Sequence, residues 1–95
     1  MTKFKEAVEK NFGTLDQYVP IVAKVHGGTH PEFHDVKRLY DEINEKVKVS
    51  ENPDLDNEFA EIRKITENYT IPLDVCESYE AVYKMLEEVD IAYKG

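Results

Sequence analysis

The sequence predicts an all-α protein folded as one domain, an antiparallel up-down bundle of four helices. Apolar residues recur at steps of three or four in four separate segments, which is the spacing of one face of a helix. The connections between these segments are roughly two to eight residues long, and connections this short place neighbouring helices antiparallel. A chain of 95 residues has room for a single domain, residues 1–95.

The first helix is expected between a capping residue, Thr2, and the glycines at positions 27 and 28. Its apolar face consists of Phe4, Val8, Phe12, Leu15, Val19 and Val22, with His26 at the end of the stripe. Gly13 and Pro20 lie inside this segment, and proline removes a backbone donor and clashes with the carbonyl one turn back. We therefore expect a weak point and a kink, and a helix broken near Gly13 and Pro20 is an alternative to a continuous one. Gly27 and Gly28 end the helix, because glycine accepts positive φ.

Three further stripes predict the other helices. The second consists of Phe33, Val36, Tyr40, Ile43 and Val47, the third of Leu55, Phe59, Ile62, Thr66 and Tyr69, and the fourth of Val75, Tyr79, Val82, Leu86, Val89 and Tyr93. Polar runs that contain proline separate these stripes at residues 50–54 and 70–74. The residue before a proline disfavours the helical conformation, so we expect both runs to be loops.

The net charge of −8 at pH 7 is unevenly distributed. Residues 1–48 carry eight basic and eight acidic residues, whereas residues 49–95 carry four basic and twelve acidic ones and therefore the whole net charge. An acidic surface repels nucleic acid and anionic lipid, so neither is an expected partner. We expect the third and fourth helices to form an acidic hairpin that suits a basic protein partner, with a homodimer as an alternative.

Targeting and redox features point to the cytoplasm. No apolar run approaches the roughly 20 residues that span a bilayer, and the first ten residues lack the apolar region of a signal peptide. Cys76 is the only cysteine, so the chain forms no internal disulfide. We therefore expect a cytoplasmic protein without a membrane segment, stabilised by packing.

Three histidines, His26, His30 and His34, stand four residues apart, a spacing that would align them as a metal array on an unbroken helix. The glycines at positions 27 and 28 interrupt such a helix, and His34 is expected to point toward solvent. His26 alone falls on an apolar stripe. We interpret it as a buried or half-buried polar residue at a helix end, where the dipole favours an imidazolium, and a metal ligand is the alternative.

Other candidate residues give weaker signals. Cys76 is expected near the start of the last helix, where a helix N-terminus favours a nucleophilic thiolate. The preferred interpretation of Cys76 is a small apolar filler, because free cysteine is among the most buried residue types. The acids of the last two helices are interpreted as a solvated face. The sequence has no nucleophile-elbow, P-loop, HExxH or dinucleotide-binding motif, so we expect no catalytic residues.

Two stretches resemble the iron-sulfur cluster repair di-iron proteins, whose C-terminal domain is hemerythrin-like. Residues 25–43, VHGGTHPEFHDVKRLYDEI, resemble the family's VHG..HPEL..V..LF..L segment. Residues 61–86, EIRKITENYTIPLDVCESYEAVYKML, resemble its IR.LT..YTPP..AC.TY.ALY..L segment. Both occur in the family's order. The resemblance implies a hemerythrin-like four-helix bundle.

The family's function depends on two irons held by histidines and glutamates in the bundle core, and the resemblance carries over only His26, in the VHG motif. The other ligand positions fall near Lys5, at Val49–Asp54, at Asn52–Asp56 and beyond Lys94, where this sequence offers no matching ligands. One inherited ligand does not hold a di-iron centre, since each iron needs several protein donors. The resemblance therefore implies a shortened, metal-free relative that acts as a non-catalytic binding or regulatory module.

Two alternatives remain. In the first, His26 binds iron or zinc together with a carboxylate of the third helix, Glu58 or Glu61, or with His26 of a second chain across a dimer axis. Such a protein would act in iron-sulfur repair or in the response to nitrosative or oxidative stress, as the resemblance implies. In the second, the acidic hairpin binds a basic partner, and a full-length repair protein is one candidate.

Overall fold

The computed structural model describes residues 2–95, with side chains from residue 3 onward. Within these residues it contains four helices: α1 (Thr2–His26), α2 (Glu32–Val49), α3 (Asp56–Ile65) and α4 (Glu77–Lys94). No strand occurs in residues 2–95. The prediction of an all-α protein with four helices is therefore confirmed.

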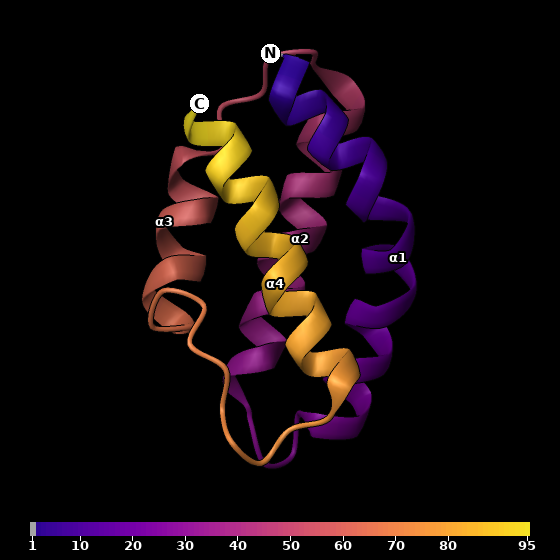
Figure 1. Cartoon of the computed structure of the whole chain (residues 1–95), viewed down its shortest axis with the longest axis vertical. Helices are drawn as coiled ribbons and strands as arrows, with labels where there is room; N and C mark the ends of the chain where they lie inside the picture. Colours follow the sequence, from indigo (N-terminus) through magenta and orange to yellow (C-terminus); the bar gives the residue numbers. More distant parts are fainter. Residues whose placement is uncertain (1) are drawn as a thin grey trace.

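The helices lie side by side along the long axis of a molecule that measures 36 × 23 × 18 Å (Figure 1). α1 packs against both α2 and α4, and α2 packs against α3. The start of α1 and the end of α4 lie at one end of the molecule, while the α1–α2 connection and the loop before α4 lie at the other. None of the described helices is long and apolar enough to cross a membrane.

α1 is continuous from Thr2 to His26, so the alternative of a first helix broken near Gly13 and Pro20 is wrong. Gly13 and Pro20 are both exposed, which leaves the buried stripe around them intact. A proline inside a helix costs about 3 kcal/mol. Burial of Leu15 and Val19 in the same stretch offsets that cost, because a fully buried aliphatic side chain contributes about 1.5–3 kcal/mol.

The core is rich in tyrosines whose hydroxyls keep polar partners. Tyr40 is buried against Phe12 and donates its hydroxyl to Asp16 Oδ1 at 2.6 Å. The hydroxyls of Tyr79 and Tyr83 are 3.0 Å apart and hydrogen-bond to each other. These pairings let large rings fill the bundle without leaving a buried hydroxyl unsatisfied.

α3 ends at Ile65, about one turn before its apolar stripe does. Residues 67–69 have φ between 52° and 63°, in the left-handed region. The Thr66 hydroxyl holds this turn, since it donates to the carbonyl one turn back at 2.7 Å and accepts from the Tyr69 N–H at 2.9 Å. The turn places the Tyr69 hydroxyl 2.7 Å from Asp90 Oδ2 on α4. Where the apolar stripe predicted one more turn of α3, the chain instead forms the hydrogen bond between Tyr69 and Asp90.

Candidate functional site: the histidine and cysteine end of the bundle

The end of the bundle that holds the α1–α2 connection contains two histidines, each hydrogen-bonded to the segment before α4. His26 Nε2 lies 3.1 Å from Cys76 Sγ. His30 Nε2 lies 3.1 Å from Asp74 Oδ1, and its Nδ1 lies 3.0 Å from Glu32 Oε2. We call these five residues the histidine–cysteine corner. It joins the last residue of α1, the α1–α2 connection and the start of α4.

Gly27 allows the tight turn on which the corner is built. A Cβ at this position would collide with the His34 ring and with the Ala23 carbonyl, whereas a Cβ at Gly28 would meet nothing. Among the described glycines only Gly95 has a positive φ, so the expectation that Gly27 and Gly28 end α1 through positive φ is wrong. Glycine is required at position 27 because the His34 ring and the Ala23 carbonyl approach its backbone closely. His34 is exposed, as predicted.

Cys76 is exposed and occupies the N-cap position of α4. The interpretation of Cys76 as an apolar filler is therefore wrong. α4 begins at Glu77, so position 76 precedes its first turn. Its side chain makes no capping hydrogen bond to α4, and its sulfur instead lies against His26.

His30 is held between two carboxylates. The hydrogen bond to Glu32 is the main reason why the pKa of His30 lies above its ordinary value of 6.5. Desolvation is the next largest effect and lowers this pKa, while the hydrogen bond and charge of Asp74 raise it. Both ring nitrogens face carboxylate oxygens, and only the imidazolium donates from both. The charged histidine therefore ties the α1–α2 connection to the loop before α4.

Aromatic side chains fill the core beneath His26. The Tyr79 ring is fully buried and meets His26 edge-on, with centroids 5.5 Å apart and an interplanar angle of 85°. Tyr79 also packs on Phe33 and Tyr83, with centroid distances of 5.0 and 4.9 Å. Burial raises the pKa of both the Tyr79 and the Tyr83 hydroxyls, so these groups stay neutral.

The structure does not bring the candidate metal ligands together. Glu58 lies in the first turn of α3, at the opposite end of the bundle from His26 (Figure 1), and its Oε2 is 2.7 Å from Lys46 Nζ. Its Oε1 is buried without a hydrogen-bond partner. Glu61 is exposed, and its Oε2 lies 3.7 Å from Arg38. Within residues 2–95, no group of three or more His, Cys, Asp or Glu side chains is placed to hold a metal ion.

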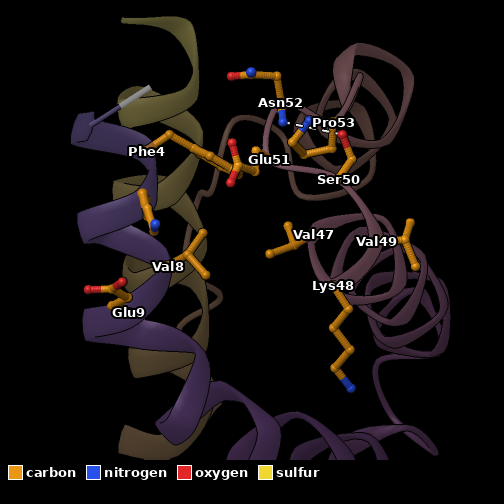
Figure 2. A pocket seen from close by; sticks show the side chains of 11 residues that line it. Phe4, Val8, Glu9, Val47, Lys48, Val49, Ser50, Glu51, Asn52 and Pro53 are labelled. Carbon is orange, nitrogen blue, oxygen red and sulfur yellow. Dashed lines mark hydrogen bonds between the residues drawn. The ribbon is translucent and has the colours of Figure 1, made fainter.

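A groove with a volume of about 590 Å³ opens at the other end of the molecule (Figure 2). It lies between the first half of α1 and residues 47–53, and Figure 2 shows Val8 and Val47 facing each other across it. Its lining carries charges of both signs and no histidine or cysteine: Phe4, Lys5, Val8, Glu9, Val47, Lys48, Val49, Ser50, Glu51, Asn52 and Pro53. The groove is therefore separate from the histidine–cysteine corner and has no preference for ligand charge.

Several acids of the predicted acidic hairpin pair with basic residues of the first half of the chain. Glu88 pairs with Lys10 on α1 at 3.1 Å, Glu58 with Lys46 on α2, and Asp74 with His30. The pairing with Lys10 lowers the pKa of Glu88. The acidic half of the sequence thus contacts the electrically neutral half through ion pairs, in addition to presenting exposed acids to solvent.

The sequence indicated His26 and Cys76 as separate candidates and did not predict that their side chains are in contact. They are 50 residues apart, and only the packing of α1 against α4 brings them together. The signal available was that His26 ends the first predicted helix and Cys76 begins the last. Two helices that pack side by side in opposite directions place such ends together.

Comparisons of this chain with protein-family models, curated proteins and solved structures find no match.

Proposed function

We propose that this protein is a hemerythrin-like, up-down four-helix bundle and a relative of the iron-sulfur cluster repair proteins that lacks most of their metal ligands. It works as a metal-free binding or regulatory module in the cytoplasm and not as an enzyme. The proposal depends on which side chains fill the core beside His26. Phe33, Tyr79 and Tyr83 pack there in mutual contact, whereas di-iron bundles direct histidine and glutamate ligands into this space.

The donors near His26 do not fit a di-iron centre. Each iron of such a centre needs several histidine or carboxylate ligands. His26 Nε2 already makes a hydrogen bond with Cys76 Sγ. The core there holds the hydroxyls of Tyr79 and Tyr83, and a neutral phenol does not supply the negative charge of a carboxylate. Among the described residues, the buried carboxylate oxygen without a partner belongs to Glu58 in the first turn of α3, and the start of α3 lies at the opposite end of the bundle from the end of α1 (Figure 1). We therefore derive no chemistry through a metal.

Charge supports a protein partner as the ligand of such a module. The acids Glu67, Glu77 and Glu87 are exposed on the half of the chain that carries the net charge of −8. A basic protein surface complements this charge, and a full-length repair protein is one candidate. Binding of this kind weakens steeply with salt, because exposed charges are screened within about 8–10 Å at physiological ionic strength. Salt-insensitive association would instead indicate apolar contacts.

Thermal denaturation with added metal tests the metal-free function. We expect iron(II) and zinc, added to untagged protein under anaerobic conditions, to leave the melting temperature of the wild type unchanged. The alternative to this proposal is a protein that binds iron or zinc through His26. A metal ion that binds the folded but not the unfolded chain raises the melting temperature, and the rise grows with the logarithm of the metal concentration above the Kd. Stabilisation by either metal that disappears in His26→Ala would overturn the proposal.

A further inference from the structure

The contact between His26 and Cys76 places a base beside an accessible nucleophile. Cys76 is exposed, and its Sγ lies 3.1 Å from His26 Nε2. The thiolate is the reactive form of cysteine, and an imidazole within hydrogen-bond distance accepts the thiol proton. Cys76 and His26 come from distant parts of the chain and meet at hydrogen-bond distance. They therefore have the arrangement of a thiol–imidazole pair.

His26 is held in this position by the core. Its ring meets the buried Tyr79 ring edge-on, and its backbone carbonyl accepts the His30 N–H at 2.7 Å. The imidazole is only partly buried, so one side of the ring is fixed by aromatic packing while Nε2 reaches the sulfur at the surface. The base therefore needs no rearrangement before it takes the proton.

The charges around the pair come from three elements. Lys24 is on the last turn of α1, Glu77 follows Cys76 in α4, and His30 lies nearby in the α1–α2 connection with its carboxylates Glu32 and Asp74. The amide groups at the start of α4 favour negative charge on the sulfur, and Glu77 opposes it. His26 is the group in direct contact with the sulfur, and its protonated form stabilises the thiolate most strongly.

We propose that Cys76 is a modification site at which small disulfides, of the glutathione class, exchange with the thiol. His26 Nε2 takes the proton from Cys76, and the thiolate attacks one sulfur of the disulfide. A new S–S bond forms at Cys76 as the disulfide's own S–S bond breaks, and the departing thiolate receives the proton held by His26. The small disulfide is the oxidant, and one of its halves leaves as a reduced thiol.

The modification is stable until an external thiol removes it. Cys76 is the only cysteine in the sequence, so the mixed disulfide is not resolved within the chain. The adduct separates Sγ from His26 at the point where α1 meets the start of α4. The proposal does not depend on whether the core binds metal, so its failure would leave the proposed function untouched.

The rate of thiol exchange tests the proposal. The probe is dithionitrobenzoate, an aromatic disulfide that releases a coloured thiolate, applied to the full-length protein in buffer and in urea. We expect the folded wild type to react faster than the unfolded chain at neutral pH, and His26→Gln to slow the folded protein by about tenfold or more. His34→Gln is the matched control, since His34 lies beside Gly27, and it should retain the wild-type rate.

A further measurement identifies the modified residue. Oxidised glutathione should add one glutathione to the wild type and none to Cys76→Ser, as measured by intact mass. A folded wild type that reacts no faster than the unfolded chain would overturn the proposal without relying on any variant. So would equal rates for the folded wild type and folded His26→Gln.

Discussion

The Arg63 guanidinium of α3 contacts both carboxylate oxygens of Asp90 on α4, at 2.7 and 2.9 Å from Nη1. The side chain of Asp90 is only 3% exposed, and it also accepts the Tyr69 hydroxyl at 2.7 Å. Three hydrogen bonds thus satisfy one buried charge. They tie α3 and the turn after it to the C-terminal part of α4.

Removal of Arg63 should destabilise the fold strongly. Arg63→Met leaves a buried carboxylate without its counter-ion, a change that costs about 3–5 kcal/mol. Chemical denaturation monitored by circular dichroism measures the loss. The matched control is Arg38→Met, whose guanidinium pairs with Glu42 and Glu61 on the surface and whose loss should cost about 1 kcal/mol or less. Equal losses in the two variants would show that Asp90 does not need its partner.

The two glycines after α1 should respond differently to alanine. Gly27→Ala forces a methyl group against the His34 ring and the Ala23 carbonyl, and overpacking of this kind costs about 1–3 kcal/mol. Gly28→Ala adds a methyl group in open space and should be close to neutral. Thermal denaturation compares the two variants. Similar melting temperatures would contradict the close approach at Gly27.

The left-handed turn after α3 should tolerate glycine better than its present residues. Glu67 has a φ of 52°, a conformation that costs a non-glycine residue roughly 1–2 kcal/mol. Glycine loses more entropy on folding, so Glu67→Gly should give a net gain of roughly 0.5–1 kcal/mol. Glu61→Gly, an exposed site within α3, should instead lose about 1 kcal/mol. If both variants are destabilised in urea, the turn is not left-handed.

The stabilisation from His30 should be largest in mild acid. Its folded pKa is raised above 6.5, mainly by Glu32, so its contribution is fully present below pH 6.5 and is lost as the pH rises through the folded pKa. The melting temperature of His30→Gln should therefore fall furthest below that of the wild type at low pH. NMR titration should show that Glu32→Gln lowers the pKa of His30 more than Asp74→Asn does. If the melting temperatures of the wild type and His30→Gln instead differ more as the pH rises, His30 is not stabilised by its carboxylate partners.

Periodicity predicted the core well because helical burial repeats locally. Phe33, Ile62 and Leu86 are buried as their stripes predict. Four apolar stripe members, Val8, Val47, Val75 and Tyr93, are only partly buried, and Val8 and Val47 line the groove between α1 and the end of α2. Local spacing indicates which side of a helix faces inward. It does not indicate how closely two helices approach along their length.

The candidate site was harder to predict because it depends on contacts between distant segments. The sequence predicted that His26 is a buried or half-buried residue at a helix end, and the structure shows it as the last residue of α1 with intermediate exposure. The burial preference of cysteine suggested the wrong environment for Cys76, since the loop before α4 exposes it. Glu58 proved to be a buried partner of Lys46, which no local pattern indicates.

Iron analysis tests the central claim most directly, because the claim concerns what occupies the core beside His26. Untagged protein expressed in iron-rich medium, aerobically and anaerobically, should contain iron far below one atom per chain and show no oxo-bridge absorption. That result follows if Phe33, Tyr79 and Tyr83 fill the space that ligands would need. Two irons per chain, with an oxo-bridge absorption band, would contradict it.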